Sequence, residues 1–401
     1  MALNLVSTLE GHEDIVWQVA WNGSILSSCG SDLSVRIWQK ESETTEYECT
    51  CILGKSHERT IRSLQWSFDG EYLATASFDS TVNIWKFTPS SKSNDNEDSF
   101  ECVSTLKGQE KELKSVCWSP IWKNFSLKKQ YLACCSRDHS VWIWEKISSD
   151  DFEISEVLEG HEGDVKHVAF SPTEPILASS SYDNSVRIWS HVSLNSDKKQ
   201  KNGNLKGGEL LDELAEEMEW KAQGKLSDHT NIVRSTSFSA DGKILVSVSA
   251  DRSLIIYEKT EEQETKKKEE DEKEKEKEKE TNKEEEKEKD EEYQGKSALY
   301  EFSSDIQSTA GWVIRQKIEN LHERNIMSVD IKKDDEKLTI ATCGEDDCIH
   351  ILQEDEKNVI QKIISIPNAH KSDINCVTWG ENNLLASCGD DRLVKIWKFE
   401  N

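Results

Sequence analysis

The sequence of 401 residues predicts an all-β protein in which seven similar units of short strands close into a ring. Three observations lead to this prediction. A sequence motif made of an acidic turn, an alternating apolar segment and a final aromatic or apolar residue occurs seven times. A turn that contains histidine precedes six of the seven copies. Finally, an apolar N-terminal segment fits a strand that the last repeat lacks.

The recurring motif gives the length of the sequence repeat. Its copies are SDLSVRIW at 31–38, FDSTVNIW at 78–85, RDHSVWIW at 137–144, YDNSVRIW at 182–189, ADRSLIIY at 250–257, EDDCIHIL at 345–352 and DDRLVKIW at 390–397. The shorter intervals between copies are 45 to 47 residues, and the apolar alternation within each copy indicates strands. Four short strands in about 45 residues are the signature of a WD40 repeat, so we predict a seven-bladed WD40 β-propeller.

Each repeat carries residues that can tie its turns together. Every copy of the motif has an aspartate six residues before its last residue: Asp32, Asp79, Asp138, Asp183, Asp251, Asp346 and Asp391. The preceding turns supply His12, His57, His161, His229, His322 and His370, whereas the third repeat has Gln109. A turn aspartate can accept hydrogen bonds from backbone N–H groups and from the loop histidine. We therefore predict a structural turn network, less tied in the repeats with Gln109, Tyr257 and Leu352.

We expect a single propeller domain over residues 1–401. The predicted repeats are about 10–45, 55–86, 107–145, 159–190, 227–258, 320–353 and 368–399. Residues 3–9 precede the first turn and should supply the outer strand of the last repeat, which closes the ring and removes the exposed sheet edges.

Extra length is placed unevenly around the ring. Insertions at 87–101, 119–130, 190–219 and 258–311 all fall on the face opposite the histidine and aspartate turns, which leaves the turn face compact. Residues 258–292 hold 19 acidic and 11 basic side chains, so we expect the 258–311 insertion to be disordered in large part. Within the other long insertion, residues 209–220 have the spacing of a short amphipathic helix.

Composition excludes several classes of protein. The net charge of −27 argues against a nucleic-acid binder, which needs basic residues to neutralise phosphates. No apolar run is long enough for a transmembrane helix, and the N-terminus has no secretory signal, so we expect no membrane partner. Eleven cysteines without such a signal indicate a reducing compartment. We therefore expect a cytoplasmic and nuclear protein.

Catalytic and metal-binding motifs are not found in the sequence. It contains no nucleotide-binding glycine loop, nucleophile elbow or zinc-spaced cysteine pairs. Cys29, Cys134, Cys343 and Cys388 recur just before the blade turns, where small apolar side chains pack into a core. We expect no enzyme activity, no cofactor and no metal site.

The turn face carries a candidate docking surface for a protein. In propellers, the residues that begin each first strand and those that precede each turn aspartate point toward the top of the channel. Blades two to five contribute five cations and no acid at these positions, with aromatic residues beside them; the set is Arg62, Lys114, Arg137, Lys166, Arg234, Trp17, Phe78 and Tyr182. Arginine beside aromatic rings is typical of interaction hot spots and suits a partner with a carboxylate and an aromatic group. Solvated cations that align by chance are the alternative interpretation.

The repeats resemble one WD40 family in particular. YLACCSRDHSVWIWEK at 131–146, VLEGHEGDVKHVAFSP at 157–172 and ILASSSYDNSVRIW at 176–189 resemble the WD40 subunit of the cytosolic iron–sulfur protein assembly targeting complex. RTIRSLQWSFDGEYLATASFDSTVNIW at 59–85 and NLLASCGDDRLVKIW at 383–397 fit the same family. The resemblance covers all seven repeats but not the insertions, whose length resembles fungal members.

This resemblance implies a non-enzymatic adaptor that is a monomer outside its complex. Its expected partners are a helical-repeat scaffold subunit, a small carrier-type subunit and apo iron–sulfur clients that receive [4Fe–4S] clusters. Some clients of the family are thought to be recognised through a C-terminal tail that ends in an aromatic residue. The exposed arginine of the family motif corresponds to Arg137.

Two other functions remain open at the level of sequence. One is a generic WD40 interaction adaptor of another complex, such as a ubiquitin ligase or a chromatin complex. The other is direct iron–sulfur binding through the cysteines, which stoichiometric iron in the purified protein would reveal.

Overall fold

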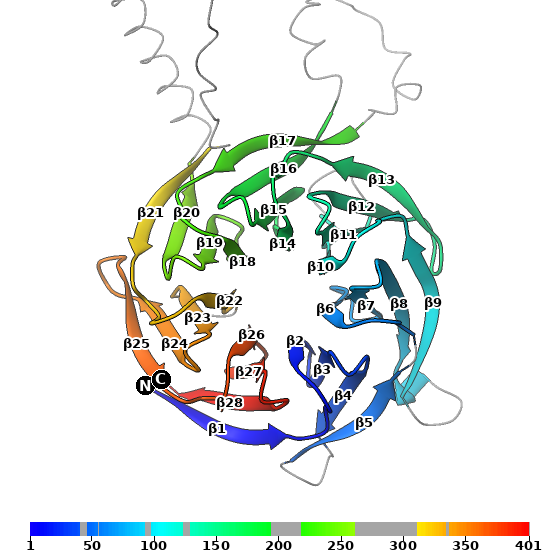
Figure 1. Cartoon of the computed structure of the whole chain (residues 1–401), viewed down its shortest axis with the longest axis horizontal. Helices are drawn as coiled ribbons and strands as arrows, with labels where there is room; N and C mark the ends of the chain where they lie inside the picture. Colours follow the sequence, from blue (N-terminus) through cyan, green and yellow to red (C-terminus); the bar gives the residue numbers. More distant parts are fainter. Residues whose placement is uncertain are drawn as a thin grey trace, which may run out of the picture.

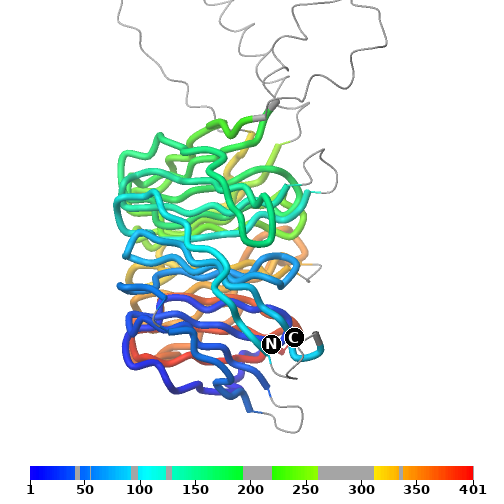
Figure 2. The backbone as a smooth tube through the Cα atoms, turned by 90° about the vertical axis from the view of Figure 1, so that its right-hand side faces the viewer, coloured from blue at the N-terminus to red at the C-terminus, as the bar shows by residue number. Residues whose placement is uncertain are grey.

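The computed structural model describes residues 1–40, 46–54, 56–92, 98–122, 129–193, 218–260, 311–333 and 337–400. These residues form seven four-stranded antiparallel sheets arranged as blades around a central axis (Figure 1). Figure 2 shows the ring from its side, with the strands of each blade crossing its thickness. The predicted all-β, seven-bladed propeller is confirmed.

The blades follow one another along the chain, each running from an inner strand to an outer one. The first four blades are β2 (Val16–Asn22), β3 (Ile25–Gly30), β4 (Val35–Lys40) and β5 (Tyr47–Leu53); β6 (Ile61–Trp66), β7 (Tyr72–Ser77), β8 (Thr81–Thr88) and β9 (Ser99–Lys107); β10 (Leu113–Trp118), β11 (Tyr131–Ser136), β12 (Val141–Lys146) and β13 (Phe152–Leu158); and β14 (Val165–Phe170), β15 (Ile176–Ser181), β16 (Val186–Ser193) and β17 (Met218–Leu226). The last three are β18 (Val233–Phe238), β19 (Ile244–Ser249), β20 (Leu254–Lys259) and β21 (Trp312–Ile318); β22 (Ile326–Ile331), β23 (Thr339–Gly344), β24 (Ile349–Glu354) and β25 (Ile360–Ile366); and β26 (Ile374–Trp379), β27 (Leu384–Gly389), β28 (Val394–Glu400) and β1 (Ala2–Leu9). One short 3-10 helix, η1 (Ser90–Lys92), follows β8.

The N-terminal strand closes the ring, as predicted. β1 pairs antiparallel with β28, from Ala2 opposite Glu400 to Leu9 opposite Val394. The two chain ends therefore lie together on the outer side of blade seven (Figure 1). This pairing gives the last blade its fourth strand and leaves β28 without an open edge.

The outer strands fall largely between the predicted repeats. Each predicted repeat covers mainly the three inner strands of its blade, and the strand that follows completes the sheet. Apolar alternation alone marks the outer strands weakly, because half of their side chains are exposed on the edge of the ring.

The core lies between neighbouring blades. Ala74 and Ile84 of blade two, for example, pack with Val116 and Leu132 of blade three. At the closing junction, Val16 and Val19 of blade one pack with Val394 and Ile396 of blade seven, and Leu9 joins them. Because each interface is apolar on both sides, no blade buries its sheet alone, and stability depends on an unbroken ring.

The long insertions are described only at their ends. β16 continues to Ser193 and β17 begins at Met218, so 194–217 is the part of the 190–219 insertion outside the described residues. Of the helix expected at 209–220, the described part from Met218 to Trp220 is instead strand, paired with β16. The disorder expected for 258–311 concerns mainly 261–310, which also lies outside the described residues. Over the described ranges, no helix is both long enough and apolar enough to cross a membrane.

Closure by β1 can be tested with two leucines on the same strand. Leu3 is 6% exposed and belongs to the core between blades six and seven, whereas Leu5 is 51% exposed. Leu3→Ala should lower the free energy of unfolding by about 2–4 kcal/mol, because it removes buried methyl groups and leaves a cavity. Leu5→Ala should change it by less than about 0.5 kcal/mol. Urea denaturation of both variants provides the comparison, and equal losses would contradict the packing role of β1.

Candidate protein-docking surface

The predicted turn residues come together in six of the seven blades. The loop histidine presents Nδ1 to the turn aspartate at 2.8–3.0 Å in the pairs His12–Asp32, His57–Asp79, His161–Asp183, His229–Asp251, His322–Asp346 and His370–Asp391. Its Nε2 lies 2.7–2.9 Å from a serine or threonine hydroxyl on the second strand of the blade. Where the blade has its tryptophan, the indole N–H donates to that same hydroxyl, as Trp38 does to Ser28 at 2.8 Å.

In these six blades, the aspartate also accepts hydrogen bonds from two backbone segments, the loop that enters the blade and its own turn. Asp183 accepts hydrogen bonds from the backbone N–H groups of Glu162 at 3.1 Å and Ser185 at 3.0 Å. Partial burial opposes its ionisation, but the hydrogen bonds from His161 and Ser185 outweigh it and hold the pKa of Asp183 below its ordinary value. The carboxylate therefore joins the loop that enters the blade to the turn between its second and third strands.

Blades three and five depart from this pattern. Gln109 has no aspartate contact of the histidine type; its side-chain oxygen accepts from the Cys134 thiol at 3.4 Å. Asp138 instead accepts from the backbone N–H of Ser140 at 3.0 Å and from its hydroxyl. In blade five, the Tyr257 hydroxyl donates to Asp228 at 3.1 Å. Whether these two blades, and blade six with Leu352, are less tied stays a prediction.

A β-bulge fixes the first set of candidate docking residues. The register of every inner strand shifts at its second residue, for example between Leu113 and Ser115 in blade three. The residues at the shift are Trp17, Arg62, Lys114, Lys166, Arg234, Met327 and Asn375. A bulged residue is left out of the ladder and its side chain is re-aimed. This accounts for the repeated orientation that the sequence predicted.

The second set is held against the first by a repeated backbone hydrogen bond. The N–H of Arg137 donates to the carbonyl of Glu112 at 3.0 Å, and that of Tyr182 to the carbonyl of Asp164 at 2.8 Å. Three cations consequently lie over aromatic rings: Arg62 over Trp17 at 4.6 Å, Lys114 over Phe78 at 4.1 Å and Lys166 over Tyr182 at 5.3 Å. The first two cation–π pairs join neighbouring blades, and the third lies within blade four.

The predicted positions of blades two to five carry no acid, but carboxylates from the preceding loops lie beside their cations. Glu112 lies within 3.0 Å of Arg59, 3.3 Å of Arg137 and 3.5 Å of Lys114. Asp164 lies 3.1 Å from Lys166. Partial burial opposes ionisation of Glu112, but the contacts with Arg59, Lys114 and Arg137 outweigh it and lower its pKa. Sequence alignment of strand starts could not reveal these carboxylates, because they lie in the loops before the strands.

Burial separates the predicted docking residues into two groups. Arg137 and Tyr182 are exposed, with 58% of the Arg137 side chain accessible. Arg62 and Arg234 are only partly exposed, and burial lowers the pKa of Arg62. Both therefore offer less area to a partner than their position in the sequence suggested.

Arg59 is a surface residue that the sequence reasoning missed. Its side chain is 55% exposed and donates to the Phe78 carbonyl at 2.8 Å as well as to Glu112. A surface hollow of about 350 Å³ is lined by Arg59, Ser80, Glu110, Lys111, Glu112 and Arg137. The signal was available, since Arg59 follows the histidine turn at His57 by two residues. We call Arg59, Phe78, Glu112, Lys114, Arg137, Lys166 and Tyr182 the cation–aromatic surface.

The opposite side of the turn face is acidic. Glu345 and Asp373 lie near Arg324, and Asn375 donates to Asp390 at 2.8 Å. Partial burial raises the pKa of Asp373, and Glu345 and Asp390 add to the effect. The turn face is therefore cationic over blades two to four and acidic over blades six and seven.

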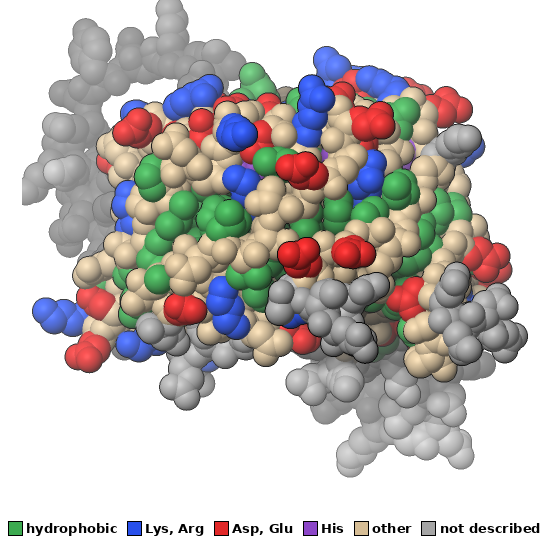
Figure 3. All heavy atoms as spheres, turned by 90° about the horizontal axis from the view of Figure 1, so that it is seen from below, with side chains coloured by type: hydrophobic (Ala, Val, Ile, Leu, Met, Phe, Trp, Pro, Cys, Tyr) green, Lys and Arg blue, Asp and Glu red, His purple; other side chains and the backbone are tan. Residues whose placement is uncertain are grey.

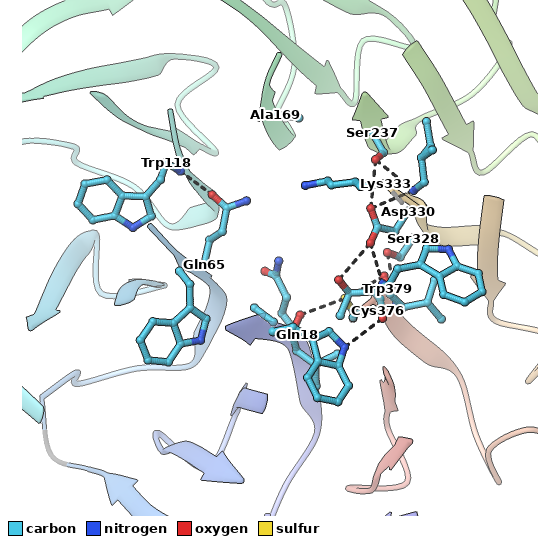
Figure 4. A pocket seen from close by; sticks show the side chains of 18 of the residues that line it. Gln18, Gln65, Trp118, Ala169, Ser237, Ser328, Asp330, Lys333, Cys376 and Trp379 are labelled. Atoms are coloured by element: carbon cyan, nitrogen blue, oxygen red, sulfur yellow. Dashed lines mark hydrogen bonds between the residues drawn. The ribbon is translucent and has the colours of Figure 1, made fainter. Parts of the chain in front are cut away.

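Figure 4 shows the other prominent hollow, a cavity of about 560 Å³ in the central channel. Several of its polar side chains connect neighbouring blades. Gln65 accepts from the backbone N–H of Trp118 at 2.5 Å, and Asp330 accepts from that of Trp379 at 2.9 Å. Gln18 does the same for Leu64 at 3.2 Å. We interpret the channel wall as a set of bonds between blades.

The outer edge of the ring carries apolar side chains. Figure 3 shows them as a band between two charged rims on one part of this edge. Exposed examples on outer strands are Leu5, Ile52, Ile154 and Ile314. Exposed apolar side chains are common on protein surfaces.

The cysteines lie within the blades and are all unpaired thiols. Cys29, Cys134, Cys343 and Cys388 are buried, and burial raises the pKa of each. Within the described ranges, the one cluster with metal-ligand spacing, His322, Asp346 and His350, contains no cysteine.

These features define a β-propeller whose turn face carries cations, aromatic rings and carboxylates side by side. The family model of the WD domain, G-beta repeat, matches residues 3–39, 47–86, 100–145, 152–190, 220–258 and 361–398. The chain therefore belongs to the WD40 repeat family, whose propellers are typically non-catalytic interaction scaffolds.

Similar proteins carry the name that the sequence resemblance suggested. The chain is 38% identical over 179 residues to "Probable cytosolic iron-sulfur protein assembly protein 1" of Mycosarcoma maydis, covering 36% of this chain and 38% of that protein. It is 27% identical over 310 residues to a "Probable cytosolic Fe-S cluster assembly factor" of Schizosaccharomyces pombe, covering 65% and 47%. It is 45% identical over 112 residues to "Protein CIA1" of Arabidopsis thaliana, covering 26% and 30%. The matches thus span about a third to a half of these relatives' length, and the resemblance is confirmed.

Buried histidines should make the ring sensitive to acid. Burial lowers the pKa of His167 and His191 to about 4, and it also lowers that of His161 and His370. The unfolded chain takes up these protons near pH 6.5, above the folded values. The stability that these neutral histidines contribute should therefore be complete above about pH 6.5. It should decrease as the pH falls toward 4, because the unfolded chain then binds more protons than the folded one. His191→Asn removes one such group and should make this slope shallower in urea titrations at several pH values; an unaltered slope would count against the argument.

Proposed function

We propose that this chain is a non-catalytic adaptor of cytosolic iron–sulfur protein assembly. In this role it links client apoproteins to the late-acting machinery and promotes insertion of [4Fe–4S] clusters into cytosolic and nuclear proteins. The names of the similar proteins support the pathway, and the WD40 fold supports protein partners rather than substrate chemistry. The expected location is the cytoplasm, with the nucleus as a second site.

The cation–aromatic surface is the observation that carries the adaptor role. Arg59 and Arg137 are both more than half exposed and line a hollow together with Glu112, and Arg59 also lies over the Phe78 ring. The exposed Tyr182 ring extends this surface onto blade four. A partner with a carboxylate can pair with the guanidinium groups, while an apolar or aromatic group of the partner packs on the rings.

The expected partners follow from the family resemblance. They are a helical-repeat scaffold subunit, a small carrier-type subunit and apo iron–sulfur clients. The partly exposed Phe78 ring and the neighbouring cations suit a client tail that ends in an aromatic residue and a terminal carboxylate. The acidic side of the turn face, around Asp373 and Asp390, leaves room for a second partner of opposite charge.

Reversal of one charge tests this assignment. Arg137→Glu would repel a docking carboxylate and add a second acid beside Glu112, so recovery of partners by affinity purification should fall roughly tenfold or more, as for a hot-spot arginine. Arg392→Glu is the matched control, because Arg392 is exposed on the same face at the turn of blade seven, outside the cation–aromatic surface.

The identities of the co-purifying proteins test the pathway separately. Apo iron–sulfur enzymes and a helical-repeat protein are expected with the unaltered chain. Recovery of ubiquitin-ligase or chromatin subunits in their place would contradict the iron–sulfur assignment. Equal recovery by the Arg137→Glu and Arg392→Glu variants, both folded, would contradict the docking surface.

A further inference from the structure

Blade six differs from the other blades at three positions that meet in space. Its strand β24 has Leu352 at the position where most blades have tryptophan. Its turn has Cys348 where blades one to five have serine or threonine. The third difference is His350, one residue into β24, where the equivalent position of blade two is Asn83. All three changes surround the His322–Asp346 pair of the turn network.

The geometry brings three ligand atoms together. Atoms of His322, Asp346 and His350 that can bind a metal all lie within 4.8 Å of one another. The two imidazole rings have centroids 4.2 Å apart and planes inclined at 38°. No other histidine of the turn network has a second imidazole beside it in this way among the described residues.

His350 belongs to this cluster and has a nitrogen without a hydrogen-bond partner. The residue is 4% exposed, and its Nδ1 is buried without a hydrogen-bond partner. Burial lowers the pKa of His350 to about 3, and the neighbouring His322 adds to the effect, while Asp346 opposes it. The imidazole is therefore neutral near pH 7, the state in which it can bind a metal. A buried polar nitrogen without a partner is costly unless something else binds it.

His322 can release one nitrogen to a metal without losing its place. Its Nδ1 faces both carboxylate oxygens of Asp346, at 2.9 and 3.1 Å, and its Nε2 lies 2.9 Å from the Thr342 hydroxyl. In blades with tryptophan, the indole N–H occupies that hydroxyl oxygen, as in the 2.9 Å bond from Trp397 to Ser387. Leu352 leaves the Thr342 oxygen open to accept Nε2–H, so that a metal can replace the proton on Nδ1.

Cys348 is placed to supply a fourth ligand. Its thiol is half-buried and contacts the carbonyl oxygen of Asp346 at 3.2 Å. In the equivalent turns, the hydroxyls of Thr81 and Ser253 lie 3.1 Å from Nδ1 of the blade histidine. Rotation of the Cys348 side chain to that same position would bring Sγ beside Nδ1 of His322.

We propose that blade six holds a zinc site made by His322, Asp346 and His350, with Cys348 as the fourth ligand. Two imidazoles, one carboxylate and one thiolate form a tetrahedral set that suits Zn²⁺. Bond lengths of about 2.0–2.3 Å place ligand atoms roughly 3.4–3.7 Å apart, so the side chains close by about 1 Å on binding. Glu323 and Asp347 lie near Cys348 and attract the cation, whereas Lys362 near His350 opposes it. Metal entry passes Cys348, which is partly exposed on the turn face.

The site is tested by zinc titration of the full chain after removal of metal with a chelator. One zinc ion per chain should bind and raise the melting temperature. His350→Asn copies the residue of blade two and should weaken zinc binding by at least about tenfold while the ring stays folded. His191→Asn is the matched control, because His191 is also buried with an unpartnered Nδ1 but lies outside the cluster.

Cobalt substitution reports the thiolate ligand separately. Co²⁺ bound to the unaltered chain should show a sulfur-to-cobalt charge-transfer band, which Cys348→Ser should abolish. The carboxylates of 258–292 are present in every variant, so any zinc that His350→Asn retains measures their background. No stoichiometric zinc in the unaltered chain, or equal zinc affinity in His350→Asn, would overturn the site. A charge-transfer band that survives Cys348→Ser would remove Cys348 from it.

Discussion

The hydrogen bonds accepted by each turn aspartate are the constraint on which the turn face depends. One carboxylate joins two loops that are about twenty residues apart in sequence, as Asp32 does with His12 and the backbone of Glu13. The residue after the aspartate takes a left-handed conformation in every blade, for example at Ser80 with φ 70° and Asn184 with φ 66°. Non-glycine residues adopt that conformation at a cost, so the surrounding bonds must hold it. The residue before the aspartate is then fixed as well, and this is where Phe78, Arg137 and Tyr182 lie.

Position in the repeat thus determines which side chains face a partner, and the identity of each side chain determines what the partner must be. The bulge on every inner strand aims one residue at the rim, and the turn aims another beside it. Blades one to four place cations and rings at these positions, whereas blades six and seven place Glu345 and Asp390 there. The turn face therefore has two sides of opposite charge, although the fold of the blades is the same on both. Charge complementarity of this kind contributes most to orientation and association rate.

Much of the fold could be predicted because repetition amplifies a weak local signal. A single alternating strand is ambiguous, but seven copies of a turn aspartate at constant spacing are not. Closure by β1 followed from the same count, since the last repeat lacked a strand. The outer strands were less visible, because their side chains are half exposed and their sequences differ. Insertion length could be read from the sequence, but the extension of β16 to Ser193 and its pairing with β17 from Met218 could not, since they depend on pairing between distant segments.

The surface was predicted in position but not in environment. A repeat alignment assigns Arg62 and Arg137 to comparable sites, yet Arg62 is largely covered beside Trp17 while Arg137 is exposed. Burial depends on neighbours from other blades, which an alignment of one blade on another does not contain. The same limit hid the role of Glu112, because it lies in a loop that varies between repeats. In blade six, Asp346, Cys348 and His350 alternate along the turn and strand, but His322 is distant in sequence and joins them only in the fold.

Glu112 gives the cation–aromatic surface its character. It is a carboxylate from the chain itself, placed where a docking carboxylate of a partner would bind, between Arg59, Lys114 and Arg137. Ion pairs of this exposure contribute about 0–1 kcal/mol each, so they orient the guanidinium groups without holding them strongly. An incoming carboxylate can share or replace these contacts at small cost, and it meets cations that are already in position. Because ordering flexible arginines is part of the cost of binding, a surface organised in this way favours association of a partner whose acid lies beside an apolar group that Phe78 can cover.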